Sequence, residues 1–241
     1  FKTEGITDLI LDLRFNNGGS VELARYLAAS IAGTSHRSDV FMKMQRSSGA
    51  DEYIRFGDGD DLNLKSVRII CSEETASASE LIISGLRGID FPVKLFGSRT
   101  EGKNVGMEVQ EYKYGNKYYE FAPITFRSFN AKDWGDYADG IDPDVMLNNQ
   151  NSNYEDDIDN VFPYAFGDWD NFDFNYPLYW ALCDVQGVDP MTGEPVKRSG
   201  RSGMTRSQPD EIIRVPSVPL KRPAGTFGSL IYNKPEVENL Y

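Results

Sequence analysis

The run Glu74-Thr-Ala-Ser-Ala-Ser-Glu80 places a serine where it could act as a nucleophile. It follows the apolar segment 67–71 and precedes apolar residues at helical spacing, so Ser77 is predicted at a strand-to-helix turn. Such a turn lifts a hydroxyl out of the sheet and directs the next amide, that of Ala78, toward a developing oxyanion. The same spacing is also that of a capping box, which requires no catalysis. This stretch alone therefore leaves a catalytic and a structural interpretation open.

A lysine in a glycine turn is the second candidate for chemistry. Lys103 lies in Thr100-Glu-Gly-Lys-Asn-Val-Gly106, between two predicted strands. The single histidine, His36, lies in a polar loop, which disfavours a Ser-His-Asp triad. A lysine whose surroundings favour the uncharged amine can accept a serine proton, so Ser77 and Lys103 could form a Ser-Lys dyad. A solvated loop lysine is the structural alternative.

The glycines around Lys103 also resemble a phosphate-binding loop. Residues 97–104, Gly-Ser-Arg-Thr-Glu-Gly-Lys-Asn, nearly match the pattern G-x-x-x-x-G-K-[ST]. Asn104 lacks the hydroxyl that would hold magnesium, and a strand is predicted where a helix is required. Nucleotide binding is therefore disfavoured.

Two consecutive glycines, Gly18 and Gly19, follow the apolar segment 8–14. Glycines after a buried strand allow backbone amides to approach a ligand closely. They serve a tight strand-to-helix connection equally well, so they are candidates rather than a site by themselves.

The composition of the chain excludes several classes of function. Of its 241 residues, 40% are hydrophobic and 26% are charged, which is typical of a globular protein. A net charge of −12 opposes nucleic acid binding, because each phosphate contact needs a cation. Two cysteines and one histidine cannot form a cysteine-rich or three-histidine zinc site, and Asp168–Asp173 lacks the glycine and terminal glutamate of an EF-hand loop. We therefore expect no metal and no cofactor.

The charge is unevenly distributed along the chain. Between residues 132 and 173, twelve acidic residues stand against one basic residue. From residue 191 onward, eight basic residues stand against five acidic ones, in a stretch rich in Pro, Gly and Ser. This basic arm could complement the acidic window of a neighbouring copy and so form a homo-oligomer.

Two strand-to-helix units predict an α/β core with right-handed crossovers. Their strands are predicted at 8–14 and 67–71, and their helices at 21–31 and 77–86. Further predicted elements are a hairpin of 40–44 with 52–56, a strand at 92–96, strands at 106–110 and 112–124 joined around Gly115-Asn116, an acidic loop at 148–160, and a helix at 174–185.

Taken together, these motifs resemble those of the tail-specific, or carboxy-terminal processing, serine peptidases. The chain carries Leu9-Ile-Leu-Asp-Leu-Arg-Phe-Asn-Asn-Gly-Gly19, then Thr75-Ala-Ser-Ala-Ser-Glu80, then Gly102-Lys103, in the order and spacing of that family. The segment Asp139-Gly-Ile-Asp-Pro-Asp-Val145 is similar to a fourth family landmark. The resemblance covers about residues 5–147. It implies a ClpP/crotonase-like ββα superhelix core, to which the residue patterns add β-hairpins and an irregular carboxy-terminal extension.

By this resemblance, Ser77 corresponds to the nucleophile and Lys103 to the general base. The amide of Ala78, with that of Gly18 or Gly19, would form the oxyanion hole. The implied activity is hydrolysis of peptide bonds in protein or peptide substrates, near their carboxyl ends and without a cofactor.

The chain matches one further family residue and departs from the pattern at two others. Glu80 corresponds to an acidic residue that supports the site. Met107 stands where the family often has a glutamine that orients the lysine, and Gln110 is the candidate to replace it. Gly88 stands where some members have an aspartate.

The resemblance, together with the composition of the carboxy-terminal part, predicts a domain organisation. Residues 1–147 would form a catalytic core, incomplete at its amino end, with 148–188 as an acidic, aromatic-rich extension packed on it. Residues 189–241 would form the basic arm, whose last four residues match a cleavable tag. Family members often carry an upstream peptide-binding PDZ module and are mostly exported to the periplasm or cell envelope, as we expect for this chain. The alternative, favoured by Met107, is a catalytically inactive peptide-binding or scaffold protein on the same fold.

Overall fold

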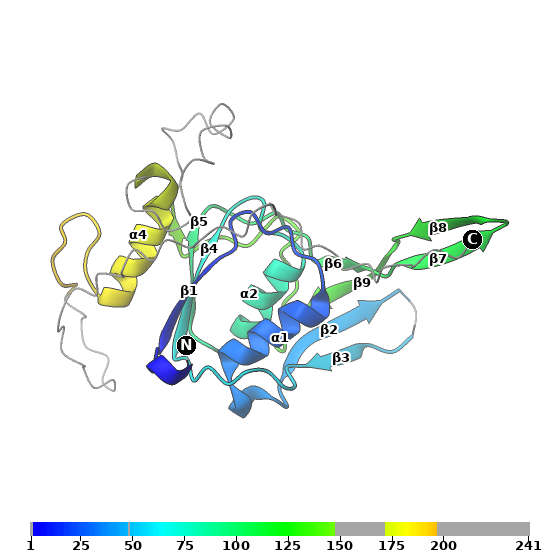
Figure 1. Cartoon of the computed structure of the whole chain (residues 1–241), viewed down its shortest axis with the longest axis horizontal. Helices are drawn as coiled ribbons and strands as arrows, with labels where there is room; N and C mark the ends of the chain where they lie inside the picture. The colour runs from blue at the N-terminus through cyan, green and yellow to red at the C-terminus, as the bar shows by residue number, and fades with distance from the viewer. Residues whose placement is uncertain (1, 48, 148–171, 197–241) are drawn as a thin grey trace.

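The computed structural model describes residues 2–47, 49–147 and 172–196, which form two main sheets with helices between and beside them (Figure 1). The first sheet is parallel and has the strand order β1-β4-β5-β10. Its strands are β1 (Asp8–Asp12), β4 (Ser66–Cys71), β5 (Val93–Gly97) and β10 (Val145–Met146). The predicted α/β core is therefore confirmed. The two-residue strand β10 was not predicted, because so short a segment shows no periodicity.

Helices α1 (Val21–Ala32) and α2 (Ala78–Gly88) follow β1 and β4, as predicted. Ser20 caps α1 by accepting a hydrogen bond from the Leu23 amide at 3.3 Å. Both helices lie between the two sheets, whereas α4 (Phe172–Gln186) covers the other side of the parallel sheet (Figure 1). Because β4 leads into α2, the N-terminus of α2 stands at the carboxyl edge of the parallel sheet, where ligand sites of α/β proteins form.

The second sheet is antiparallel and has the strand order β3-β2-β9-β6. Its strands are β2 (Val40–Arg46), β3 (Glu52–Arg55), β9 (Ile124–Phe129) and β6 (Val105–Met107). The predicted hairpin of 40–44 with 52–56 is confirmed by the pairing of β2 with β3.

A separate hairpin of β7 (Gln110–Tyr114) and β8 (Lys117–Phe121) projects from the second sheet (Figure 1). Its turn contains Gly115, whose φ of +60° favours glycine, as the sequence predicted. The predicted strand at 112–124 is wrong in its extent, because the chain divides it into β7, a turn, β8 and the start of β9. Strand β9 then pairs with β2, far away in the sequence, and local patterns do not reveal such a contact.

The shared core holds α2 in place. Its residues Ile83 and Leu86 are fully buried. Phe41 of β2 and Phe56 pack edge to face, with ring centroids 5.3 Å apart. Gly85 lets α2 approach β2 closely, because a Cβ atom there would lie 2.6 Å from the Phe41 ring.

Two short 3-10 helices complete the described part of the chain, η1 (Lys2–Glu4) and η2 (Thr34–His36). His36 lies in η2, with its Nδ1 atom 2.8 Å from the carboxylate of Asp39. In the described residues, no helix is both long enough and apolar enough to span a bilayer.

Part of the predicted carboxy-terminal organisation lies outside the described residues. This holds for the acidic loop at 148–160 and for the arm beyond residue 196. It also holds for the first four residues of the acidic segment 168–173, which was compared with an EF-hand loop. The helix predicted at 174–185 corresponds to α4.

Charged contacts attach α4 to the parallel sheet. The carboxylate of Asp184 accepts a hydrogen bond from Arg68 Nε at 2.9 Å and one from Lys94. Arg68 also donates to Asp8 of β1 at 2.5 Å. Burial acts to raise the pKa of Asp184, but the hydrogen bonds from Lys94 and Arg68 outweigh it and hold this pKa below its ordinary value of 3.8.

We predict that Asp184→Asn lowers the free energy of unfolding by about 1–2 kcal/mol, because the amide loses the charge-assisted contacts with Arg68 and Lys94. Urea unfolding followed by circular dichroism measures this loss. Asp142→Asn is the matched control, since Asp142 pairs with Arg99 at an exposed site. The control should change stability by less than about 0.5 kcal/mol.

The same contacts make stability depend on pH. The pKa values of Asp8 and Asp184 are both lowered, so their contribution is present above the ordinary value of 3.8 and is lost as pH falls through the lower folded-state values. Between about pH 5 and pH 3, wild type should therefore lose stability more steeply than Asp184→Asn. Parallel pH curves for the two proteins would contradict this account.

Candidate active site

The turn that carries Ser77 is fixed to the end of β1. Thr75 is completely buried, and its Oγ1 donates to the Leu13 carbonyl at 2.7 Å and accepts from the Ser72 amide at 2.9 Å. Ser77 itself has φ +54° and ψ −115°, a conformation that non-glycine residues rarely adopt. Strain of this kind costs about 1–3 kcal/mol and persists only where the surroundings impose it. The surroundings therefore impose this backbone conformation on Ser77.

The glycine loop after β1 packs directly against this turn. A Cβ atom on Gly18 would lie 2.6 Å from the Ala78 nitrogen and 2.9 Å from the Ser77 Cβ, so only glycine permits this approach. Asn16 joins the two loops, because its Oδ1 accepts from the Gly18 amide and from Ser79 Oγ, both at 3.0 Å. Sequence reasoning missed Asn16. Its place two residues before a glycine turn is the one local signal that could have indicated it.

The backbone donors near Ser77 are not equally available. The Gly18 amide is already bonded to Asn16 Oδ1. Within the described residues, the amides of Ala78 and Gly19 donate to no acceptor. A free N–H group at the N-terminus of a helix, such as that of Ala78 next to Ser77, can stabilise a negatively charged oxygen.

Glu80 connects the serine turn to the lysine loop. Its side chain is fully buried, and its Oε2 accepts the amide of Ser77 at 2.8 Å and the amide of Lys103 at 2.9 Å. Its Oε1 accepts Thr100 Oγ1 at 2.6 Å and the Gly102 amide at 2.8 Å. One carboxylate therefore accepts four hydrogen bonds, of which two come from the backbone amides of the candidate catalytic residues Ser77 and Lys103.

The segment 139–145 contacts the loop that contains Lys103. Thr100 Oγ1, which donates to Glu80, accepts the Ile141 amide at 2.7 Å. Gly102 has φ +98°, and a Cβ atom there would lie 2.4 Å from the Ala138 carbonyl oxygen. These contacts connect the fourth sequence landmark to the loop that contains Lys103.

Gln110 lies outside this group of residues. It begins β7 on the projecting hairpin, is exposed, and stands opposite Phe121. Met107 ends β6 and is 44% exposed. The structure thus brings together Ser77, Ala78, Gly18, Glu80 and the Lys103 backbone, and leaves Gln110 apart.

Two other reactive groups in the core are held neutral. Burial raises the pKa of Cys71 to about 12, so its thiol is not a nucleophile at neutral pH. Burial also raises the pKa of Tyr137 to about 12, and its hydroxyl is 2.8 Å from Ser128 Oγ. Among the described residues, no group of three His, Cys, Asp or Glu side chains could hold a metal ion.

Comparison with known proteins identifies the family. Residues 1–147 match the model of peptidase family S41, and the chain belongs to that family. It is 26% identical over 147 residues to the "Probable CtpA-like serine protease" of Staphylococcus haemolyticus, covering 60% of this chain and 28% of that protein. It is 27% identical over 170 residues to the protein of the same name in Staphylococcus aureus, covering 69% of this chain and 32% of the relative. The match thus spans about a third of the length of these relatives.

The fold is also found in a solved structure of this family. A crystal structure from Bacteroides fragilis, named as an S41 protease, superposes with a TM-score of 0.62 at 23% identity. The superposition covers 78% of this chain and 46% of that one. At this level of identity the likeness concerns the fold alone.

We predict that Glu80→Gln lowers the free energy of unfolding by about 2–4 kcal/mol. The amide nitrogen of glutamine would stand where a carboxylate oxygen now accepts two hydrogen bonds, and it cannot accept them. Chemical unfolding of the purified chain provides the measurement. Glu101→Gln, an exposed change in the same loop, is the control and should alter stability by less than about 0.5 kcal/mol. Equal stabilities of the two variants would show that the carboxylate does not hold the loops together.

Proposed function

We propose that the chain contains the catalytic centre of a serine peptidase that uses a Ser-Lys dyad. Ser77 is the nucleophile and Lys103 the general base, while Ala78 and Gly19 supply the oxyanion-hole amides. Of the two glycines considered from the sequence, Gly19 has the stronger support, because the Gly18 amide is engaged by Asn16. The single observation that carries the proposal is the Glu80 carboxylate, which accepts the amides of both dyad residues.

The proposed reaction transfers an acyl group in two steps. The Ser77 hydroxyl gives its proton to the Lys103 amine as Oγ attacks the scissile carbonyl. The oxyanion of the tetrahedral intermediate accepts hydrogen bonds from Ala78 and Gly19. The lysine then protonates the leaving amine, and a water molecule, deprotonated by Lys103, hydrolyses the acyl-enzyme and restores the serine.

The wider properties of the protein follow from family resemblance. We propose protein or peptide substrates, processed near their carboxyl ends, and an exported location in the periplasm or cell envelope. We also propose that residues 1–147 form the catalytic core on a ClpP/crotonase-like superhelix, with 148–188 and 189–241 as its extension and arm. An upstream PDZ-like segment belongs to the same proposal.

A non-catalytic peptide-binding protein is the second candidate. Met107, which is 44% exposed, stands where the family often has an orienting glutamine, and Gln110 lies on the projecting hairpin. A wild-type chain that binds unfolded polypeptide and never cleaves it would favour this candidate.

We predict that Ser77→Ala abolishes hydrolysis of an unfolded protein substrate and leaves the circular dichroism spectrum unchanged. Ser77→Gly should also be inactive, yet more stable than Ser77→Ala by about 1 kcal/mol, because glycine adopts a positive φ without strain. Casein cleavage and urea unfolding measure the two effects. A Ser77→Ala variant that cleaves as fast as wild type would rule out this nucleophile.

We predict that Lys103→Arg and Lys103→Ala are both inactive, although arginine preserves the positive charge. A guanidinium group stays protonated at accessible pH and cannot accept the serine proton. Initial rates of cleavage measure the loss. Lys65→Arg is the control, because it makes the same change at an exposed lysine outside the candidate site. Activity in Lys103→Arg would remove lysine from the role of base.

A further inference from the structure

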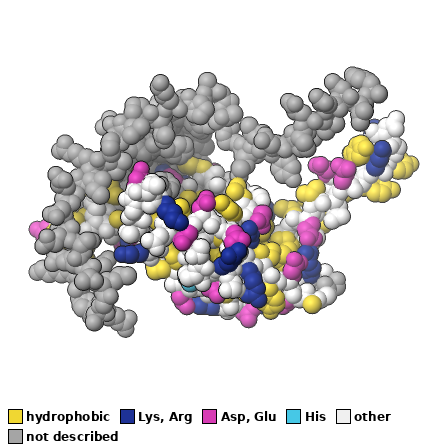
Figure 2. All heavy atoms as spheres, turned by 60° about the horizontal axis from the view of Figure 1, so that its bottom comes forward, with side chains coloured by type: hydrophobic (Ala, Val, Ile, Leu, Met, Phe, Trp, Pro, Cys, Tyr) yellow, Lys and Arg dark blue, Asp and Glu magenta, His cyan; other side chains and the backbone are white. Residues whose placement is uncertain are grey.

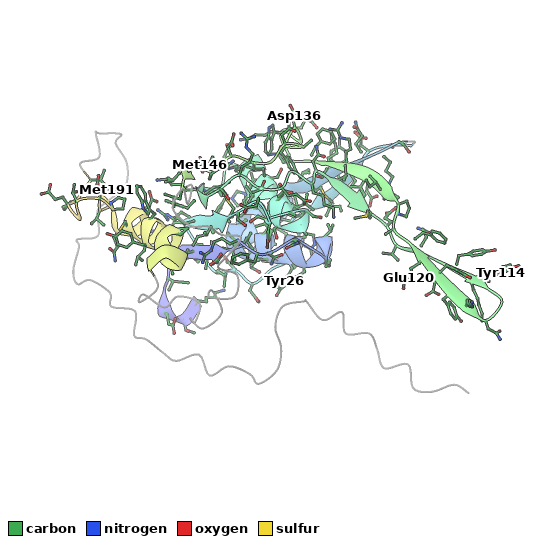
Figure 3. The ribbon with its side chains drawn as sticks, turned by 90° about the horizontal axis from the view of Figure 1, so that it is seen from above. Tyr26, Tyr114, Glu120, Asp136, Met146 and Met191 are labelled. Atoms are coloured by element: carbon green, nitrogen blue, oxygen red, sulfur yellow. The ribbon has the colours of Figure 1, made fainter. Side chains whose placement is uncertain are left out.

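The projecting hairpin exposes an unusual number of aromatic side chains. Every residue of β7 and β8 is exposed. Its aromatic residues and their exposed fractions are Tyr112 (59%), Tyr114 (70%), Tyr118 (60%), Tyr119 (43%) and Phe121 (56%). Figure 2 shows hydrophobic side chains gathered on this projection, and Figure 3 shows Tyr114 near its far end. An isolated two-stranded hairpin is marginally stable in water, so an aromatic hairpin of this kind indicates a surface that packs against a partner.

The strand register sorts these side chains onto two faces. Residues directly opposite each other in an antiparallel pair share a face, and successive pairs alternate. One face, which we name the aromatic face, consists of Gln110 with Phe121, Tyr112 with Tyr119, and Tyr114 with Lys117. The opposite face, the charged face, consists of Glu111 with Glu120 and Lys113 with Tyr118. Four of the five aromatic residues therefore lie on one side, and that side carries no carboxylate.

We propose that the aromatic face is a dimer interface that binds the same face of a second copy of this chain. A two-fold axis that runs perpendicular to the strands, in the plane of the interface and at the Tyr112–Tyr119 pair, packs these two residues on their counterparts. It also brings the tip of each hairpin to the base of the other. Lys117 at the tip then meets Phe121 at the base of the second copy, where an ammonium group over a ring is favourable.

The area available fits a weak dimer. Four aromatic side chains, each exposed by 43–70%, offer roughly 500 Å² per copy if a whole aromatic side chain presents about 200 Å². Two copies would bury roughly 1,000 Å² in total, at the lower limit of specific interfaces. Interfaces of this size are typical of weak, transient association.

Charge also favours contact at the hairpin. The chain carries a net charge of −12, so two copies repel each other over most of their surfaces. On the hairpin, two glutamates and two lysines cancel. Salt screens the repulsion between the bodies, so this dimer becomes tighter as salt rises. A contact between the basic arm and the acidic window would show the opposite trend, because salt weakens attraction between unlike charges.

Sedimentation equilibrium of the 241-residue chain at roughly 50 mM and 500 mM NaCl tests the proposal. We expect a monomer–dimer equilibrium whose dissociation constant falls at the higher salt. The double variant Tyr112→Ser/Tyr119→Ser should raise this constant at least tenfold. Tyr118→Ser is the matched control, because it removes an equally exposed tyrosine from the charged face and should leave the constant unchanged.

Disulfide trapping provides a second test that does not depend on how the double variant folds. Tyr119→Cys near the axis should form a covalent dimer under mild oxidation, whereas Tyr118→Cys should not. The native Cys71 and Cys183 are buried and do not interfere.

A monomer at every concentration, a dimer that weakens with salt, or a dimer unaffected by the double variant would overturn the proposal. A monomer that binds reduced, carboxymethylated polypeptide, and loses that binding in the double variant, would assign the face to substrate instead.

Discussion

The site depends on a single buried carboxylate. Glu80 is inaccessible to water, and each of its oxygens accepts two hydrogen bonds from loops that lie far apart in the sequence. A buried charge is tolerated only when such donors replace its lost hydration. The need to solvate Glu80 therefore draws the Ser77 turn and the Lys103 loop together. The relative position of the two candidate catalytic residues is in this sense a consequence of burying one negative charge.

Close backbone approach is the second constraint, and glycine makes it possible. Gly18 lies against the Ser77 turn, and Gly102 lies against the segment near Ala138, at distances that a Cβ atom would obstruct. Both glycines also have positive φ, at +95° and +98°. Asn16, which accepts hydrogen bonds from Gly18 and Ser79, and Thr100, which donates to Glu80, then fix the loops that these glycines allow to meet. Packing and polar contacts act on the same two loops, which gives the site a rigid frame before any substrate binds.

The two ends of the described molecule contrast in their physical character. Around α2, Ile83 and Leu86 are fully buried, and the carboxylate of Glu80 accepts four hydrogen bonds. The β7–β8 hairpin has no such packing within the described residues, and its register concentrates aromatic side chains on one face. The candidate catalytic residues lie in the buried region, whereas the projecting hairpin is suited to association, since surface aromatic groups gain free energy by contact with another surface.

The sequence by itself determined the two strand-to-helix units, the hairpin of β2 with β3, the Gly115 turn and the residues of the candidate dyad. These features depend on local periodicity and turn chemistry, which neighbouring residues reveal. Only the tertiary structure decided that Asn16 joins two loops, that Gly19 rather than Gly18 has a free amide, and that Gln110 stands apart on a hairpin. Likewise, β9 was hidden because its partner β2 lies far away along the chain. Such contacts follow from how distant segments fold together, and no single stretch of sequence contains that information.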